Sequence, residues 1–412
     1  MPRLLAWRWH DPPAAGACGG GCGPLGLSGR CIRAIRLMAR MCAAVDRAAA
    51  EAADAGDHVF EVIADWVNLS GFTATGATGL GKAGIYLNNA DYCDICRNNV
   101  SENYYGIRLS YSSNNNTLQN NAANSNNHIG ICLSYSSNNN TLSSNNALNN
   151  DYGIWLYSSN NSMLQNNVAN SNNYGGIFLH YSNNNTLANN TVSNNGYGIH
   201  LSYSSNNTLT NNAANSNDYG IDMDSSSNNT HTNNIINSNN YYGVYLYSSS
   251  NYNTLTNNTV DSNNYGIVLI YSSDYNTIYH NNLTNTIENA YDTSTNQWDN
   301  NAEGNYYSDY IGTDNNIDGI GDDPHPIPPS GTSVGRYPLM HPWTGDTPLK
   351  GNLNHDGIIT PADAAIALRL AAGGSASCDA ATLDAADVIR DGCVTSLDAL
   401  MILQAAAGAI TL

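Results

Sequence analysis

A pair of residues, glycine followed by isoleucine or valine, recurs nine times along the chain at nearly constant spacing. The pairs begin at Gly84, Gly106, Gly130, Gly153, Gly176, Gly198, Gly220, Gly243 and Gly266, at intervals of 22 to 24 residues. A fixed period of this length is typical of stacked repeats, in which each repeat contacts only its neighbours. The function of such a chain must therefore be sought in columns of side chains along its surface.

One repeat predicts three short strands. After Gly106 the apolar residues Ile107 and Leu109 alternate with polar ones, which is the pattern of a strand with one buried face. A second strand is expected at 117–118 and a third at 121–123, separated by Asn and Ser tracts that are typical of turns. Leucine-rich repeats have a similar period but need a longer leucine frame. We therefore expect an all-β fold, a parallel β-helix with coils of 22–24 residues.

The core of this β-helix should be thin and regular, with nine coils stacked about 4.8 Å apart. The inward positions form an Ile/Leu column and a second column at Leu118, Leu142, Leu164, Leu187, Leu209, Leu255 and Ile278. Buried asparagines in the turns are expected to form ladders, each amide bonding to the next coil. The alternative, that tracts such as 138–140 are disordered low-complexity sequence, is disfavoured because the apolar register never slips.

The composition excludes some functions. Only 11% of the residues are charged, yet the net charge is −19, and phosphate binding needs a basic face, so nucleic acid is not an expected partner. No stretch of 18 apolar residues occurs, so we expect no transmembrane segment. Asn-x-Ser/Thr sequons occur at Asn115, Asn139, Asn160, Asn189, Asn206, Asn228, Asn257 and Asn282. They fit an exported, glycosylated protein, or they are simply the turn sequence.

We expect four parts in the chain. Residues 1–57 differ from the rest, with seven of the 14 basic residues and no uninterrupted apolar signal region. We interpret them as an atypical segment that is either disordered or a shifted start in place of an export signal. Residues 58–300 form the β-helix. Residues 301–348 form a cap and a Pro-rich linker, because an open β-helix end exposes a strand edge. Residues 349–412 form a small C-terminal domain.

Three segments have the spacing of calcium-binding loops. In the cap, Asp314, Asn316, Asp318 and Asp322 occupy positions 1, 3, 5 and 9 around a glycine, although an Asp/Asn-rich turn has the same composition. The C-terminal domain contains Asn352-x-Asn354-x-Asp356-Gly-Ile358-x-Thr360-x-x-Asp363. A second copy, 35 residues later, reads Asp387-x-x-x-Asp391-Gly-Cys393-x-Thr395-x-x-Asp398. Each copy ends in a carboxylate at position 12 and runs into a helical pattern.

These residues resemble two families. The β-helix with its ending NQWDN, GNYYSDY, DGIGD and YPLMHPW resembles the NosD-like right-handed parallel β-helix proteins, archaeal surface members included, and that family name comes from a periplasmic copper-insertion protein. Segment 349–412 resembles a type I dockerin. That resemblance implies calcium ligands at the loop residues named above, with the carbonyl groups of Ile358 and Cys393 included. It also implies docking to a cohesin-like module through Pro361-Ala362 and Ser396-Leu397.

The outward positions, two and four residues after each glycine, form two columns on the surface. On adjacent coils they are expected to gather Trp155, Tyr157, Phe178, His180, His200, Asp222, Asp224, Tyr245 and Tyr247. Flat rings beside carboxylates suit sugar binding, because rings stack on the apolar faces of sugars and Asp accepts hydrogen bonds from hydroxyl groups. Ordinary cross-strand pairing of aromatic residues is the alternative.

The same residues leave a catalytic and a metal-binding interpretation open. Glycoside hydrolysis needs two carboxyl groups at a set separation, and Asp222 and Asp224 on one strand face are expected roughly 6.5–7 Å apart. Lyases and polygalacturonases of this fold cluster Asp with Arg or Lys, however, and the outward columns hold only Arg108. Copper or zinc bound by His180, His200 and Asp222 lacks a third well-placed nitrogen.

We therefore interpret the chain as an exported cell-surface or secreted β-helix protein. It is expected to bind carbohydrate or surface partners and to be assembled through a calcium-dependent dockerin-like module. A polysaccharide-degrading hydrolase or lyase displayed through the same module is the alternative interpretation. A structural coat protein and a copper-delivery protein are further alternatives.

Overall fold

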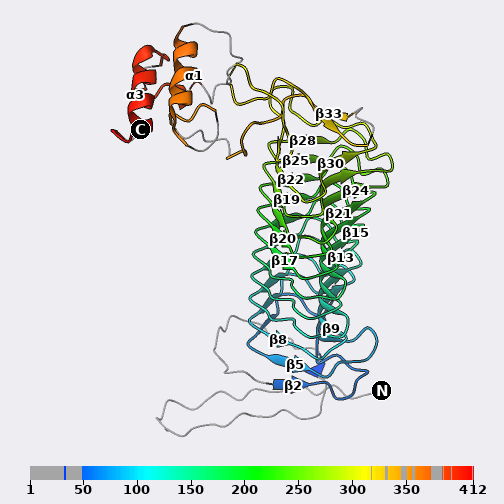
Figure 1. Ribbon diagram of the computed structural model, residues 1–412. Coiled ribbons are helices and arrows are strands. Elements are labelled where there is room, and N and C mark those ends of the chain that lie inside the picture. The colour runs from blue at the N-terminus through cyan, green and yellow to red at the C-terminus, as the bar shows by residue number, and fades with distance from the viewer. Residues whose placement is uncertain are drawn as a thin grey trace, which may run out of the picture.

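The computed structural model describes residues 32–33, 49–316, 318–329, 333–344, 350–354, 358–372, 383, 385–390, 392–410 and 412. The chain is a right-handed parallel β-solenoid of about 11 turns, followed by a small helical region (Figure 1). Most of the predicted segment 1–57 lies outside the described residues. Two short strands within it, β1 (Ile32–Arg33) and β2 (Ala49–Glu51), pair with strands of the solenoid.

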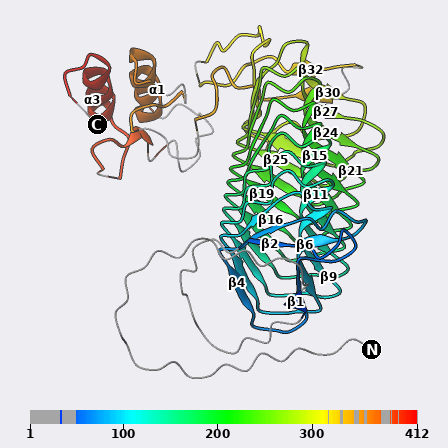
Figure 2. The ribbon, with the colours of Figure 1, turned by 90° about the horizontal axis from the view of Figure 1, so that it is seen from below.

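Strands stack along the solenoid in parallel rows on three sides, and most coils contribute one strand to each row (Figure 2). The longest row, the first sheet, has 12 strands against the nine coils expected, because coils without a Gly-Ile pair extend it at both ends. Its strands are β1, β3 (Phe60–Val62), β6 (Ala83–Asn88), β9 (Tyr105–Ser110), β11 (Ile129–Ser134), β13 (Tyr152–Tyr157), β15 (Gly175–His180), β18 (Tyr197–Ser202), β21 (Tyr219–Asp224), β24 (Tyr242–Tyr247), β27 (Tyr265–Leu269) and β30 (Glu288–Asp292).

The second sheet holds the second strand of each coil. Its ten strands are β4 (Asn68–Ser70), β7 (Asp94–Cys96), β10 (Thr117–Gln119), β12 (Thr141–Ser143), β14 (Met163–Gln165), β16 (Thr186–Ala188), β19 (Thr208–Thr210), β22 (Thr230–Thr232), β25 (Thr254–Thr256) and β28 (Thr277–Tyr279). Most begin with threonine and place one apolar residue inward, which keeps the core one side chain deep on this side.

The third side consists of two shorter sheets that isolated bridges join through residues 99, 122, 146, 168 and 191. Its strands are β2, β5 (Thr73–Thr75), β8 (Asn99–Val100), β17 (Thr191–Ser193), β20 (Ala213–Asn215), β23 (Ile235–Asn237), β26 (Thr259–Asp261), β29 (Asn282–Thr284) and β31 (Tyr306–Tyr307). An antiparallel pair, β32 (His325–Ile327) and β33 (Ser333–Gly335), lies in the cap.

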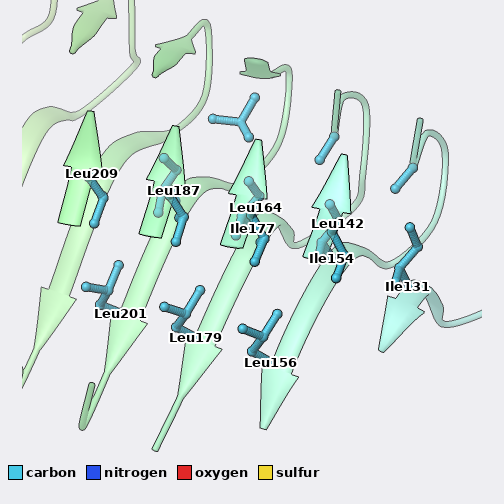
Figure 3. Packing of buried hydrophobic residues seen from close by; sticks show 14 of the residues in the cluster. Ile131, Leu142, Ile154, Leu156, Leu164, Ile177, Leu179, Leu187, Leu201 and Leu209 are labelled. Carbon is cyan, nitrogen blue, oxygen red and sulfur yellow. The ribbon is translucent and has the colours of Figure 1, made fainter. Parts of the chain in front are cut away.

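The interior is filled by columns of aliphatic side chains, as the sequence predicts. Ile131, Ile154 and Ile177 follow one another on successive coils of the first sheet, and Leu164 and Leu187 face them from the second sheet (Figure 3). All five have no solvent exposure. Because each coil repeats the same inward residues, the solenoid has one continuous core along its length.

The predicted asparagine ladders are confirmed. In one ladder the side-chain amide of each asparagine donates to the side-chain oxygen of its equivalent on the next coil, at 2.8–3.0 Å. Its members are Asn98, Asn121, Asn145, Asn167, Asn190, Asn212, Asn234, Asn258, Asn281 and Asn305. A parallel ladder runs through nine asparagines from Asn103 to Asn285. These amides satisfy backbone groups that are buried at every turn.

The repeated glycine is required by close approach between coils. A Cβ atom at Gly153 would lie 2.6 Å from the carbonyl oxygen of Gly176 and 2.8 Å from the ladder amide of Asn172. Real Cβ atoms do not approach other atoms so closely, so only glycine fits. The sequence marker of the repeat is therefore the position where the backbone of one coil rests against a ladder.

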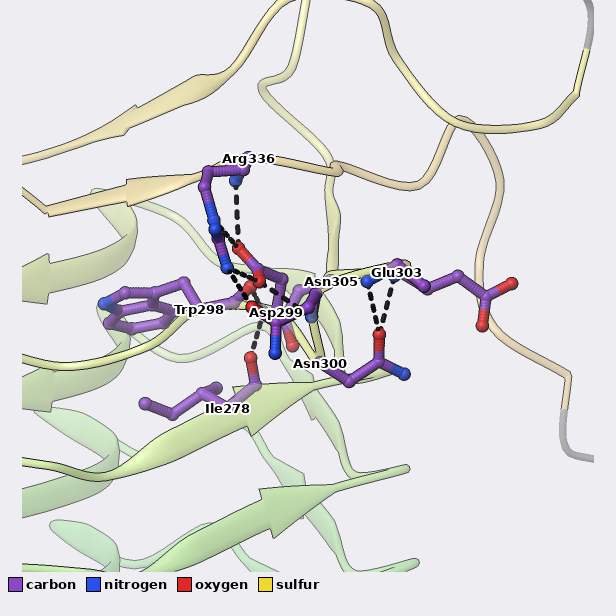
Figure 4. A network of polar contacts seen from close by, with 9 residues as sticks. Ile278, Trp298, Asp299, Asn300, Glu303, Asn305 and Arg336 are labelled. Atoms are coloured by element: carbon purple, nitrogen blue, oxygen red, sulfur yellow. Dashed lines mark hydrogen bonds and ion pairs between the residues drawn. The ribbon is translucent and has the colours of Figure 1, made fainter. Parts of the chain in front are cut away.

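The cap closes the last coils through a polar network around a buried tryptophan (Figure 4). Trp298 is fully buried, and its indole N–H donates to Asp292 at 3.0 Å. The guanidinium of Arg336 forms an ion pair with the carboxylate of Asp299, which is also buried. Asn305 continues the ladder and donates to the carbonyl oxygen of Ile278 at 2.9 Å. The cap thereby supplies partners to the strand edge that the last coil exposes.

The helical region contains α1 (Pro361–Ala371) and α3 (Ser396–Ala406). Each helix begins with a capping box, in which a threonine N-cap and an aspartate three residues later bond to each other's backbone. The two helices share a small separate core that includes Leu353, Ala367 and Ile402.

Candidate functional site

The first sheet brings all nine predicted surface residues together on one face. Strand pairing aligns Trp155, Phe178, His200, Asp222 and Tyr245 directly across five neighbouring strands. It aligns the second predicted column in the same way, with members Tyr157, His180, Ser202, Asp224 and Tyr247. We call the outward side chains of β13, β15, β18, β21 and β24 the aromatic face.

A third column borders this face and was not among the predicted residues. It is formed by the tyrosine that precedes the repeat glycine, at Tyr152, Tyr197, Tyr219 and Tyr242. Their rings contact those of the first column, for example Tyr152 with Trp155 at a centroid distance of 4.6 Å. The signal was present in the sequence, because a Tyr-Gly pair recurs at these coils.

The rings of the aromatic face pack against one another as well as facing solvent. Phe178 stacks on His200 at 4.4 Å, and Tyr245 stacks on Tyr247 at 4.8 Å. Pairs of this kind contribute about 0.5–1.5 kcal/mol each, so ring packing both between strands and along a strand stabilises the face. Phe178, Tyr245 and Tyr247 nevertheless remain partly exposed. The face is a rigid surface of ring edges and hydroxyl groups.

At the centre of the face, a histidine and an aspartate on adjacent coils lie in contact. Nδ1 of His200 is 2.5 Å from Oδ2 of Asp222. The pair is nearly buried, with exposed fractions of 8% for His200 and 1% for Asp222. The imidazole is not directed along the contact, so neither atom has a well-aligned hydrogen bond. Burial raises the pKa of Asp222, and His200 opposes that rise.

The two predicted carboxylates of β21 have different surroundings. Asp222 is buried, whereas Asp224 is partly exposed and accepts a hydrogen bond from the hydroxyl of Ser225 at 3.0 Å. Burial raises the pKa of both neighbouring tyrosines, followed for Tyr245 by the charges of Tyr242 and then Asp222, and for Tyr247 by those of Asp222 and then Asp224. Of the two carboxylates, Asp224 is therefore the one that an approaching ligand meets.

The histidines of the face do not form a metal site with their neighbours. Nδ1 of His180 is buried without a hydrogen-bond partner, and burial and His200 lower the pKa of His180. In the described part of the chain, no three His, Cys, Asp or Glu side chains gather in a group that could hold a metal ion. His180, His200 and Asp222 share a face but do not meet at one point.

In the predicted calcium loop of the cap, the carboxylates accept hydrogen bonds from backbone N–H groups of the same loop. Asp314 accepts the N–H of Gly319 at 2.9 Å, and Asp322 accepts the N–H of Asn315 at 2.7 Å. The amide of Asn316 donates to Asp318 at 2.8 Å. Ile317 lies outside the described residues. These bonds agree with an Asp/Asn-rich turn, and calcium binding here stays a prediction.

The first loop of the helical region has an arrangement that fits calcium. Asp363 is fully buried and accepts the N–H groups of Leu353 at 2.7 Å and Thr360 at 2.7 Å. The side-chain oxygen of Asn352 is buried without any hydrogen-bond partner. Such an oxygen is a suitable ligand for a calcium ion. Asp356, the predicted ligand at position 5, lies outside the described residues.

The second loop repeats part of this arrangement. Asp387 accepts the N–H of Gly392 at 2.8 Å. Asp398 is fully buried in the structure, which by itself raises its pKa, but hydrogen bonds from Thr395 and Ile389 outweigh this and hold the pKa below its usual value. Asp391 lies outside the described residues. The predicted docking pairs, Pro361-Ala362 and Ser396-Leu397, begin helices α1 and α3 respectively.

Models of known families match three ranges of the chain. Residues 64–212 match the family described as right handed beta helix region, and residues 164–312 match the periplasmic copper-binding protein (NosD) family. Residues 350–405 match the dockerin type I domain. No curated protein matches the chain. Among the described residues, we find no helix that is long and apolar enough to cross a membrane.

Solved structures with a similar solenoid are distant in sequence. A mutant of the periplasmic alginate epimerase AlgG is 17% identical, with a TM-score of 0.48, over 59% of this chain and 67% of its own. The A-module of the Azotobacter vinelandii mannuronan C-5 epimerase AlgE4 is 18% identical, with a TM-score of 0.45, over 61% of this chain and 86% of its own. The catalytic domain of a GH87 alpha-1,3-glucanase is 13% identical, with a TM-score of 0.43, over 61% of this chain and 56% of its own.

The fold, the two loop–helix units and the matched families lead to one description. The chain is a right-handed parallel β-helix that matches the NosD family model over residues 164–312 and carries a C-terminal segment that matches the dockerin type I model over residues 350–405.

Proposed function

We propose that the protein binds a polysaccharide along the aromatic face of its β-helix. The observation that carries this proposal is the alignment of three columns of rings with polar groups across five adjacent strands. A polysaccharide is itself a linear repeat, and it presents apolar ring faces and hydroxyl groups in alternation. Aromatic rings with exposed hydroxyl and carboxylate groups complement both.

A nearly buried pair, His200 and Asp222, occupies the middle of the first column. The rings of Tyr197 and Phe178 pack against the imidazole of His200, at centroid distances of 5.1 Å and 4.4 Å. Asp224 and Tyr247, two positions further along their strands, remain open to solvent and are placed to bond sugar hydroxyl groups. In this assignment Asp222 is a positioning residue, and Asp224 contacts the ligand.

The dockerin domain supplies attachment. We propose that calcium bound in its two loops holds the starts of α1 and α3, where the docking pairs lie, and that a cohesin-like module binds there. The unpartnered oxygen of Asn352 and the buried carboxylate of Asp363 support the first loop as a calcium site. An exported, surface-attached protein that holds glycans is consistent with this pair of domains.

The test uses the full chain, in calcium, by affinity electrophoresis in gels that contain one polysaccharide from a panel of neutral and acidic polymers. We expect retention by at least one polymer, and Trp155→Ala or Tyr245→Ala to weaken it about fivefold, since one ring contact contributes about 1 kcal/mol. Tyr275→Ala is the matched control. Tyr275 is 61% exposed and stacks on Tyr252 at the turn before β28, away from the aromatic face. Retention that all three variants share unchanged would contradict the proposal.

A polysaccharide-degrading enzyme is the second candidate, favoured by one observation. A buried carboxyl group with a raised pKa beside a histidine is an arrangement that acid–base catalysis uses. New reducing or unsaturated chain ends in the same incubations, lost in Asp222→Asn, would establish that candidate. Retention without new chain ends supports binding alone.

A further inference from the structure

The β-helix lacks cationic side chains over almost its whole length. Between Arg108 and Arg336 the sequence contains no lysine or arginine, whereas it contains fifteen aspartates and glutamates. This stretch includes every strand of the aromatic face, β13 to β24. A polymer that lies on the face therefore meets a field of one sign.

The few basic groups near the face are already engaged. Arg108 on β9 lies two strands away from β13, donates to the carbonyl oxygen of Gly81 at 3.1 Å and packs over Tyr105. His128, whose ring contacts those of Tyr152 and Trp155, lies 3.4 Å from the carboxylate of Asp151. His200 is in contact with Asp222. Burial and then His200 lower the pKa of His180, so the imidazole of His180 is neutral at neutral pH. No cation on the face is placed to receive an anion.

A bridging metal ion does not offset the excess of acidic over cationic side chains on the face. A divalent ion joins an anionic sugar to protein carboxylates only where several ligands converge. In the described residues no three acidic, His or Cys side chains converge, and Asp222 and Asp224 differ in burial. The face offers hydroxyl groups, ring edges and one exposed carboxylate.

We propose that the aromatic face selects uncharged polysaccharides and excludes polymers that carry carboxylate or sulfate groups. This inference rests on the proposed function and adds the chemical class of its ligand. Asp224 accepts hydrogen bonds from neutral sugar hydroxyl groups, but it repels an anionic substituent placed beside it. No cation on the face neutralises this repulsion.

The experiment compares polymers that share a backbone and differ only in charge. The full chain, in calcium, is run in native gels that contain hydroxyethyl cellulose or carboxymethyl cellulose, and methyl-esterified or de-esterified homogalacturonan, at low and at physiological salt. Mobility is expressed relative to a gel without polymer, which removes the effect of the protein's own charge. We expect retention by a neutral polymer and weaker retention by its charged partner, with the difference larger at low salt.

A charge-reversed variant tests whether the face itself sets this selectivity. Asp224→Lys places a cation among the rings, and it should improve retention by the charged polymer about two- to fivefold. Asp261→Lys is the matched control, because Asp261 makes the same bond to the following serine hydroxyl, at 3.1 Å, but lies on β26 of the third side. It should leave both retentions unchanged.

The outcomes separate this inference from the function on which it rests. Retention that is equal or stronger with the charged partner overturns the selectivity and leaves polysaccharide binding intact. Equal gains in Asp224→Lys and Asp261→Lys place the charge effect on the whole molecule and overturn the assignment to this face. Retention by none of the four polymers, together with none across the wider panel, contradicts the proposed function and the inference with it.

Discussion

The imidazole of His200 and the carboxylate of Asp222 are in contact between two adjacent coils, with Nδ1 2.5 Å from Oδ2. Burial raises the pKa of Asp222 above its ordinary value of 3.8, so the folded protein binds a proton there more tightly than the unfolded chain. The stability that this gives is present at low pH and is lost as the pH rises through the folded value.

The first prediction follows from that sign. In Asp222→Asn the side chain at position 222 has no ionisable group. The melting temperature of this variant minus that of the wild type should therefore increase as the pH rises from 3.8 towards neutrality. Thermal unfolding of both proteins at several pH values measures the gap. If this difference in melting temperature instead decreases as the pH rises, His200 keeps the carboxylate of Asp222 ionised, and the ionised carboxylate stabilises the fold.

The second prediction concerns a histidine inside the core. His231 on β22 lies between Leu209 and Leu255 in the inward column of the second sheet and is 1% exposed. Burial lowers its pKa from 6.5 to about 4, so the unfolded chain takes up a proton between these values and the folded chain does not. Stability should therefore fall by about 3 kcal/mol as the pH drops from 6.5 to 4. In His231→Leu this loss should disappear.

Denaturant unfolding at pH 7 and pH 4.5 measures this loss. Both proteins carry Asp222→Asn, so that the titration of Asp222 does not contribute to the difference between them. A pH dependence of the same size in His231→Leu would assign the acid sensitivity to other groups.

The third prediction uses two neighbouring glycines with opposite surroundings. Gly153→Ala places a Cβ 2.6 Å from the carbonyl oxygen of Gly176, whereas the nearest atom to a Cβ at Gly175 is a ring carbon of Tyr152 at 3.4 Å, an ordinary contact. Gly153→Ala should lower the free energy of unfolding by about 1–3 kcal/mol, and Gly175→Ala should change it by less than about 1 kcal/mol. Equal effects in urea titrations would show that the coils separate easily.

The fourth prediction separates the three calcium loops. Calcium titration by calorimetry should lose one ion in Asp363→Ala and one in Asp398→Ala, and chelation should lower the helical signal in circular dichroism while leaving the β-helix signal in place. Saturating calcium at about 100 times the dissociation constant stabilises the domain by about 2.7 kcal/mol. Asp314→Ala tests the cap loop: an unchanged stoichiometry there identifies an Asp/Asn turn.

Much of the fold follows from the sequence because the repeat glycine fixes the register. Once Gly153 and Gly176 are aligned, Trp155 must lie beside Phe178, and the structure pairs them so. The additional coils at the ends have no Gly-Ile pair and were not counted. Their strands, such as β3 and β30, are recognised only because they continue the hydrogen-bonded row.

The surroundings of the site residues were harder to predict. Strand alternation places Asp222 outward, but its burial depends on how the neighbouring tyrosine rings pack, which period-two patterning does not describe. The inward position of His231 could be predicted from the repeat, since Thr-His-Thr stands where other coils have Thr-Leu-Thr. A single histidine between two threonines does not by itself indicate a buried position. The predicted calcium loops are the clearest local motif in the sequence, because coordination geometry fixes the spacing of such loops.

The asparagine ladders also determine how such a molecule can change over generations. Every coil offers the next one the same amide and receives the same oxygen, so the boundary between any two coils is interchangeable with any other. A duplication of one repeat in the gene inserts a complete coil without a new interface, and a deletion removes one as cleanly. Unequal recombination can therefore lengthen or shorten the exposed face by one coil at a time.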